Sequence, residues 1–158
     1  MKLFKNVYKG KKVLITGHTG FKGFWLAMIL RSMGANVIGV SLKTDPNKKS
    51  HFNTLNGEEL IKTFYLDIKD LSSLKELTAK VKPDYIFHLA AQALVAESFK
   101  DPINTFTTNT IGSINLLESM RKTDYKCNLI MITSDKVYEN LEWVFGYREN
   151  DILGGSDP

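Results

Sequence analysis

Residues 130–138, IMITSDKVY, run from apolar side chains into a serine, an acid, a lysine and a tyrosine. These are side-chain types that carry acid–base chemistry in enzymes. The same change from apolar to polar residues also occurs wherever a buried strand leaves a core, because Ser and Asp favour turns and helix caps. The segment alone therefore leaves open whether it serves chemistry or only ends a strand.

A second candidate is TGHTGFKG (16–23), which follows an apolar run and precedes a helical pattern. Gly17, Gly20 and Gly23 are three residues apart, unlike the commoner GxGxxG spacing. Glycines there permit a tight turn, a bare backbone that a pyrophosphate can approach, and a close crossing of helix over sheet. Amide groups at the helix N-terminus would face the anion. The strand before and the helix after favour a phosphate loop over a mere tight turn.

Three other positions carry polar or small residues where a nucleotide could lie. Asp67 could accept a hydrogen bond from an adenine amine, with Ile68 packed on the ring, or it could cap a turn. In HLAA (88–91), the alanines would let a cofactor lie against the backbone, and we interpret His88 as a hydrogen-bonded core residue. Asn109 is a mediocre helix former inside a helical pattern, so we expect its amide to tie neighbouring strand ends together.

The elements that must position these residues alternate between β-rich and helical patterns, which predicts βαβ units. The expected strands are 12–16, 36–41, 62–66, 84–88 and 128–133, and the expected helices are 22–33, 70–81 and 102–122. Asp70 is the expected N-cap of the second helix. The third helix is indicated by a stripe at three- and four-residue steps, formed by Ile103, Phe106, Thr110, Ile114 and Leu117. Right-handed crossovers give strand order 3-2-1-4-5, a doubly wound parallel sheet of the Rossmann-like α/β class. Ligands in such sheets bind at the carboxyl ends of the strands, near the point where strand order reverses.

Composition limits the class of protein. The 158 residues, 43% hydrophobic and 24% charged, fit one domain spanning 1–158. The net charge of +4 comes from scattered basic residues without a basic helix, so we expect no nucleic-acid partner. No window approaches the length of a membrane span, and a single cysteine, Cys127, excludes an internal disulfide. We expect a cytoplasmic protein that does not enter a membrane.

Taken together, these motifs resemble the extended short-chain dehydrogenase/reductases in order and spacing. GHTGFKG, HLAAQALV, TSDKVYEN and EWVFGYREND are similar to the CDP-glucose 4,6-dehydratase branch, and the resemblance runs from about residue 4 onward. It implies a tightly held NAD and a nucleotide-sugar substrate, CDP-glucose. In that branch, C4 of the sugar is oxidised by hydride transfer to NAD, water is eliminated across C5 and C6, and the hydride returns to C6.

The resemblance also implies residue roles. Ser134 would hydrogen-bond the C4 hydroxyl, and Asp135 would help the C6 hydroxyl to leave. Lys136 stands where related dehydratases carry a glutamate that removes the C5 proton; it can act as a base only when neutral, which burial and a nearby cationic nicotinamide would favour. The implied cofactor residues are Gly17, Thr19, Gly20, Phe21, Lys22, Gly23, Asp67, Ile68, Leu89, Ala90, Ala91 and Asn109.

Two features leave alternatives open. The second strand ends in Ser41, Leu42 and Lys43, without the acid that binds ribose hydroxyls or an arginine for a 2'-phosphate, so the residues alone do not decide between NAD and NADP. Where the family continues past YREND into GGYDPYSxSK, this chain reads GGSDP (154–158), without the Tyr-x-x-x-Lys that starts hydride transfer.

We therefore expect an incomplete NAD-binding part, truncated before the later strands and the carboxyl-terminal substrate domain and inactive as a dehydratase by itself. Its fifth strand would be an uncovered edge that invites self-association, and the full-length enzyme would be a homo-oligomer. The alternatives are a sugar-nucleotide epimerase of the same superfamily, against which Lys136 and ENLEW argue, and a non-catalytic dinucleotide-binding module.

Overall fold

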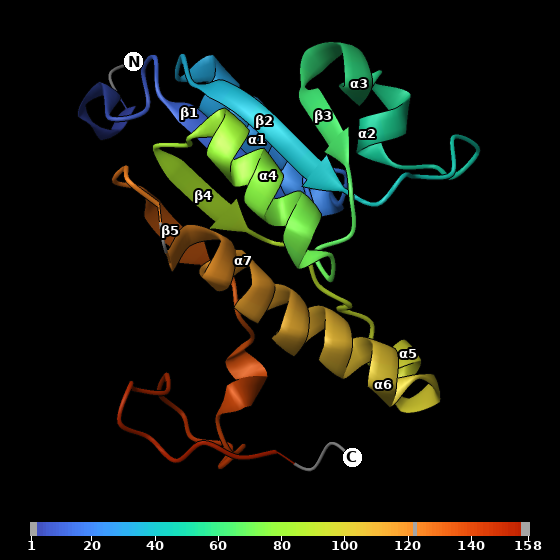
Figure 1. The fold of residues 1–158 in the computed structure, drawn as a ribbon. Helices are drawn as coiled ribbons and strands as arrows, with labels where there is room; N and C mark the ends of the chain where they lie inside the picture. Colours follow the sequence, from blue (N-terminus) through green and yellow to red (C-terminus); the bar gives the residue numbers. More distant parts are fainter. Residues whose placement is uncertain (1–2, 122, 156–158) are drawn as a thin grey trace.

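The computed structural model describes residues 3–121 and 123–155. Its centre is a five-stranded, all-parallel sheet with strand order β3-β2-β1-β4-β5 (Figure 1), which confirms the predicted topology. The strands are β1 (Lys12–Thr16), β2 (Asn36–Ser41), β3 (Lys62–Tyr65), β4 (Tyr85–His88) and β5 (Asn128–Met131). The predicted strand bounds differ from these by at most two residues, the largest difference being the end of β5.

Helices connect the strands and cover both faces of the sheet. They are α1 (Phe21–Ser32), α2 (His51–Thr54), α3 (Gly57–Leu60), α4 (Leu71–Val81), α5 (Val95–Lys100), α6 (Pro102–Phe106) and α7 (Gly112–Arg121), with short 3-10 turns η1 (Leu3–Asn6) and η3 (Asp135–Val137). Asp70 caps α4 as predicted, because its carboxylate accepts from Ser73 N at 3.1 Å. α3 and α5 were not predicted, since four and six residues are too few to show a helical period.

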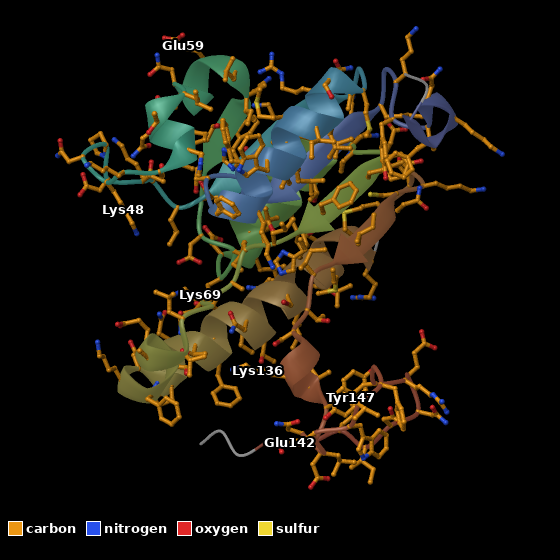
Figure 2. The ribbon with its side chains drawn as sticks, turned by 180° about the vertical axis from the view of Figure 1, so that it is seen from behind. Lys48, Glu59, Lys69, Lys136, Glu142 and Tyr147 are labelled. Carbon is orange, nitrogen blue, oxygen red and sulfur yellow. The ribbon has the colours of Figure 1, made fainter. Side chains whose placement is uncertain are left out.

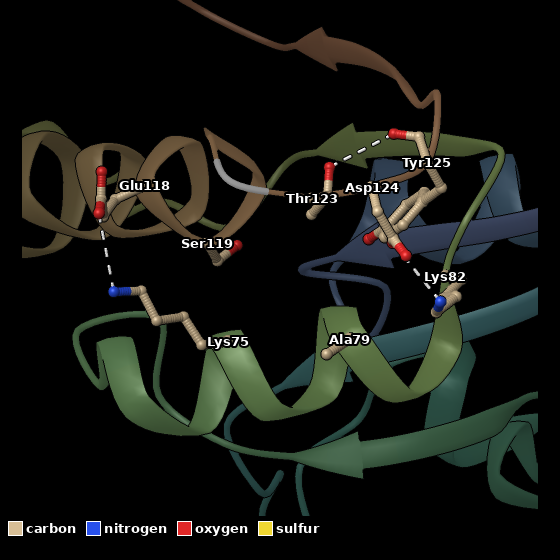
Figure 3. A pocket seen from close by; sticks show the side chains of 8 residues that line it. All are labelled: Lys75, Ala79, Lys82, Glu118, Ser119, Thr123, Asp124 and Tyr125. Atoms are coloured by element: carbon tan, nitrogen blue, oxygen red, sulfur yellow. Dashed lines mark hydrogen bonds and ion pairs between the residues drawn. The ribbon is translucent and has the colours of Figure 1, made fainter.

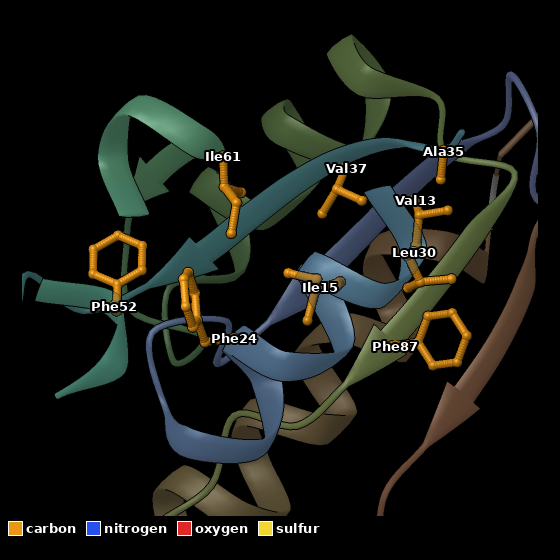
Figure 4. Packing of buried hydrophobic residues seen from close by; sticks show 10 residues of the cluster. Val13, Ile15, Phe24, Leu30, Ala35, Val37, Phe52, Ile61 and Phe87 are labelled. Atoms are coloured by element: carbon orange, nitrogen blue, oxygen red, sulfur yellow. The ribbon is translucent and has the colours of Figure 1, made fainter. Parts of the chain in front are cut away.

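The alternation of side chains along the buried strands makes two cores. Val13 and Ile15 of β1 face α1 and pack with Phe24 and Leu30 (Figure 4), whereas Leu14 faces the other way, toward α4 and α7. Successive strand residues point to opposite faces, so a central parallel strand must be apolar throughout. This two-sided burial fixes the strand ends relative to one another.

The helix predicted at 102–122 forms, but with an interruption. A π-helical segment, η2 (Thr107–Ile111), joins α6 to α7. The apolar stripe that predicted this helix faces away from the sheet: Ile103 is 77% exposed and Phe106 61% exposed. The buried side instead carries small and polar residues of α7, together with Leu116. The spacing of the apolar residues therefore predicted a helix correctly, but these residues do not lie on the face that packs against the sheet.

After β5 the chain leaves the sheet as a carboxyl-terminal arm, residues 132–155 (Figure 1). Tyr138 pairs with Leu153 in an isolated antiparallel bridge, and its ring stacks on Tyr147 with centroids 5.3 Å apart. Trp143 stacks on the same Tyr147 at 6.0 Å. The arm is thus held mainly by its own aromatic contacts. Across the described ranges, no helix combines the length and apolarity that crossing a membrane requires.

Candidate functional site

The carboxyl ends of β1, β4 and β5, which precede most of the predicted residues, lie at one edge of the sheet. Parallel pairing places Thr16 of β1 beside His88 of β4, and His88 beside Met131 of β5. The glycine loop follows Thr16, the 89–91 segment follows His88, and Ser134 comes three residues after Met131. Because the strands are parallel and adjacent, the segments that follow them leave the sheet at the same edge.

The glycine loop touches its neighbours backbone to backbone. Gly17 has a φ of +75°, which favours glycine, and its amide donates to Val40 O at 2.7 Å. A Cβ on Gly17 would lie 2.8 Å from Ala90 N, and a Cβ on Gly23 would lie 2.2 Å from Gly17 O. The loop, the first turn of α1 and the segment after β4 are therefore packed as closely as bare backbone allows.

The start of α1 presents free amides beside this loop. The first bond of the helix runs from Phe24 N to Gly20 O at 2.9 Å, so the amides of Phe21, Lys22 and Gly23 have no intrahelical acceptor. The Phe21 and Lys22 side chains are exposed and Gly23 is buried. Positive ends of backbone dipoles and a lysine at one helix terminus suit an anion.

A pocket of about 290 Å³ opens next to this helix start. Its lining residues are Thr19, Gly20, Phe21, Thr44, Lys48, Ser50 and Asn53. Lys48 lies in the loop between β2 and α2 (Figure 2), beyond the end of the second strand. Three predicted residues, Thr19, Gly20 and Phe21, thus border this pocket. The loop after β2, together with Asn53 of α2, forms the rest of it, and the polar residues of that loop form no motif that predicts a role.

A chain of hydrogen bonds ties the exit of β4 to the loop and to α7. Ser113 Oγ donates to Asn109 O at 2.6 Å, so it must accept from His88 Nε2, 3.1 Å away. His88 Nδ1 then accepts from the Thr16 hydroxyl at 2.6 Å, and Thr16 Oγ1 accepts from Ala90 N at 3.2 Å. Burial lowers the pKa of His88, in keeping with a neutral ring. The structure confirms His88 as a satisfied core histidine.

Asn109 does not face solvent without partners, but its amide ties a single strand exit to the long helix rather than joining two neighbouring strand ends. Its Oδ1 accepts from Gln92 N at 2.8 Å and its Nδ2 donates to Gln92 O at 3.0 Å, so one amide pairs with the whole backbone of one residue. Asn109 sits in the π-helical segment, where single-turn interruptions often mark functional positions. The segment after β4 is thereby fixed against the long helix. No sequence motif predicts that Gln92 is the partner of Asn109.

Asp67 and Ile68 follow β3, and both side chains already contact other parts of the protein. Asp67 Oδ1 accepts from Lys69 N at 2.9 Å, and Oδ2 lies 3.5 Å from Lys69 Nζ, so the carboxylate stabilises a turn. Ile68 is 5% exposed and lies under α7, where a Cβ on Gly112 would come within 2.5 Å of Ile68 Cδ1. The Ile68 side chain thus packs against α7 in this structure, and its contact with an adenine ring stays a prediction.

The second group of candidate residues, 134–136, follows β5, and its described side chains are more exposed to solvent than the glycine loop. Ser134 and Lys136 are exposed, and Ser134 Oγ accepts from Lys136 N at 3.2 Å at the start of the arm (Figure 2). Lys136 is therefore not buried among the described residues. Asp135 belongs to η3, but its side chain lies outside the described part of the structure.

Another pocket, of about 420 Å³, lies between α4 and the end of α7 (Figure 3). Ion pairs border it, with Lys75 Nζ 3.7 Å from Glu118 Oε1 and Lys82 Nζ 3.5 Å from Asp124 Oδ1. α4 and α7 end there just before β4 and β5 begin, so this pocket is at the amino ends of the strands. None of the predicted residues lines it, and it lies opposite the edge described above.

Comparison with known proteins agrees with this geometry. Residues 14–157 match the family model described as GDP-mannose 4,6 dehydratase. The chain belongs to this family. Among curated members of similar sequence, CDP-glucose 4,6-dehydratase of Salmonella typhimurium is 45% identical over 98% of this chain and 43% of its own length. CDP-paratose 2-epimerase of Salmonella typhi is 34% identical over 89% of this chain and 41% of its own length.

Solved structures of related sugar-nucleotide enzymes have the same fold. UDP-glucose 4-epimerase of Thermotoga maritima, determined with UDP-glucose, superposes on 91% of this chain and 45% of its own, with 32% identity and a TM-score of 0.75. The corresponding enzyme of Stenotrophomonas maltophila, with bound NAD, gives a TM-score of 0.75 and 26% identity over 91% of this chain and 43% of its own.

This member of the GDP-mannose 4,6-dehydratase family spans less than half the length of those relatives. The resemblance to the extended short-chain dehydrogenase/reductases is confirmed, as is the similarity to CDP-glucose 4,6-dehydratase within them. The comparisons support a sugar-nucleotide dehydratase or epimerase type of Rossmann-like domain. The individual roles of the site residues remain predictions.

Proposed function

We propose that this chain is the NAD-binding part of a sugar-nucleotide 4,6-dehydratase that converts CDP-glucose to CDP-4-keto-6-deoxyglucose. The observation that carries the proposal is the contact between Gly17 and the segment after β4, beside the open first turn of α1. It supports a dinucleotide site in a chain 45% identical over 98% of its length to a CDP-glucose 4,6-dehydratase.

The residues present fit a dinucleotide. The pyrophosphate needs bare backbone and donor groups, which Gly17, Gly20 and the amides of Phe21 to Gly23 supply, with Lys22 as a nearby cation. Leu89, Ala90 and Ala91 would border the middle of the cofactor. Thr19 and Phe21 would border its adenosine half from the 290 Å³ pocket. When bound, NAD supplies a hydride acceptor for the C4 position of the sugar.

The residues after β5 would act on the sugar. Ser134 would hydrogen-bond the C4 hydroxyl, Asp135 would protonate the departing C6 hydroxyl, and Lys136 would remove the C5 proton. Because Lys136 is exposed in this structure, we propose that further groups cover it when it acts as the base. We infer that the 158 residues, in which no Tyr-x-x-x-Lys follows Ser134, bind NAD without turning over CDP-glucose.

Calorimetry and a product assay test the proposal. NAD should bind with one-to-one stoichiometry, and no 4-keto sugar nucleotide should accumulate. CDP-glucose should bind the NAD-loaded chain measurably but weakly, because the contacts expected from a substrate domain are not among these 158 residues. A folded chain that binds no NAD would contradict the coenzyme site, and steady turnover of CDP-glucose would contradict the inferred inactivity. The alternative of a non-catalytic dinucleotide-binding module predicts NAD binding with no measurable binding of CDP-glucose.

A further inference from the structure

His18 lies inside the glycine loop, yet its side chain points away from the exposed side of that loop. The ring is 0% exposed, whereas Gly17 and Thr19 on either side are partly exposed. A phosphate loop needs no large side chain at this position, because its work is done by backbone amides. The burial of this ring must therefore be explained by its packing against the sheet and not by phosphate binding.

The ring fills a slot on the sheet that exists only because residue 39 is glycine. A Cβ on Gly39 would lie 2.3 Å from His18 Cδ2 and 2.3 Å from Cγ. Gly39 is in the middle of β2, paired with Ile15 of β1 and Thr63 of β3. Glycine weakens a strand interior and commonly marks a close approach of another group. Here the group is the imidazole of the loop.

A hydrogen bond and an aromatic contact fix the ring in this slot. Thr63 Oγ1 donates its proton to Ile61 O at 3.1 Å, so it accepts from His18 Nε2, 2.9 Å away. Nδ1 has no hydrogen-bond partner among the described residues. Burial lowers the pKa of His18, and the Val40 backbone near the ring partly offsets this lowering. Phe52 of α2 meets the ring edge-on, with centroids 5.3 Å apart. The ring thus joins the loop to β2, β3 and α2 at once.

We propose that His18 is a positioning residue, whose ring locks the glycine loop onto Gly39 and Thr63 so that the amides of the first turn of α1 are held in place for a dinucleotide. Gly17 and Gly23 hold the loop toward β4 and α1, and His18 supplies the remaining anchor, toward β2 and β3. Preorganisation of this kind raises affinity by reducing the entropy lost on binding. The inference rests on the proposed coenzyme function of the loop.

A double-variant comparison separates this role from general folding. Gly39→Ala alone should destabilise the chain strongly, because its methyl group collides with the ring. His18→Ala with Gly39→Ala should recover most of that stability, since the methyl group then occupies the vacated slot. The double variant should nevertheless bind NAD at least about tenfold more weakly and exchange the loop amides 18–23 faster than the wild type. As single substitutions, His18→Gln, which keeps a donor for Thr63, should retain more of the wild-type NAD affinity than His18→Leu.

Failure has distinct signatures. Wild-type NAD affinity and wild-type amide exchange in the folded double variant would overturn the positioning role. Equal instability of Gly39→Ala with and without His18→Ala would overturn the fit between ring and slot. If the wild-type chain binds no NAD, the proposed function fails, and the exchange rates of the loop amides then decide the positioning role alone.

Discussion

The glycine loop and the carboxyl-terminal arm both carry residues suited to chemistry, but the fold holds them in different ways. The loop is fixed by backbone contacts that leave no room for a methyl group at Gly17 or Gly23. The arm relies on stacked rings, one bridge and local hydrogen bonds, and its tip residue Val144 is 96% exposed. One region is therefore positioned by the core, and the other is positioned by its own local contacts. The core thus holds the residues proposed to bind the coenzyme, whereas the residues proposed to act on the sugar begin a more exposed segment.

Alanine at two glycines gives the sharpest contrast between these regions. Gly23→Ala places a Cβ 2.2 Å from Gly17 O, so the loop or α1 must move; we expect a loss of about 3 kcal/mol in the free energy of unfolding and a large loss of NAD affinity. Gly146→Ala in the arm meets no atom within 4 Å and should change stability by less than about 0.5 kcal/mol. Urea unfolding measures both. Equal effects would mean that the two regions are equally packed.

Two asparagines extend the contrast to hydrogen bonding. Asn109→Ala removes both bonds to Gln92 and should cost about 1 to 2 kcal/mol of stability. Asn140→Ala removes the acceptor of Tyr147 OH within the exposed arm and should cost less than about 0.5 kcal/mol. Thermal unfolding of the two variants checks the order. A larger effect at Asn140 would show that the arm contributes to the cooperative core.

The pH dependence of the free energy of unfolding should reflect two buried histidines beside the glycine loop, His18 and His88. Burial lowers the pKa of His18 and His88 in the folded chain, below the ordinary value of about 6.5. The unfolded chain then binds more protons, so the free energy of unfolding should fall as the pH drops below about 6.5 toward the folded pKa values. Urea unfolding between pH 7.5 and 5.5, above the ordinary range of carboxylates, measures this slope.

Replacing one of these rings identifies the source of the slope. His88→Gln should reduce the slope, while His51→Gln, at an exposed position, serves as the control. A slope that is unchanged by His88→Gln and by His18→Gln would contradict the assignment to the buried rings.

The smallest effect on the fold is expected from the exposed helix stripe. Ile103→Lys with Phe106→Lys removes apolar surface without touching the core, so stability should change little. If this surface and the β5 edge drive self-association, light scattering at high concentration should give a lower mass for the variant than for the wild type. A wild-type mass equal to one chain at every concentration would contradict self-association.

What the sequence could predict follows from how local each signal is. The strands, the cap at Asp70 and the glycine loop depend on short patterns, so they were predictable. The slot between His18 and Gly39 depends on two segments that meet only after β2 pairs with β1, and no local pattern marks it. The burial of Ile68 likewise depends on where α7 crosses β3's exit. The exposed stripe of α6 shows the same limit, because periodicity gives a helix but not its partner.

Hydrogen exchange with and without NAD tests the central claim most directly, since it reports both regions in one measurement. We predict slower exchange for amides in 18–23 and 89–92 when NAD is added, with unchanged exchange in 140–150 of the arm. Binding of NAD without protection of 18–23, or with protection centred on 140–150, would contradict the placement of the coenzyme at the glycine loop.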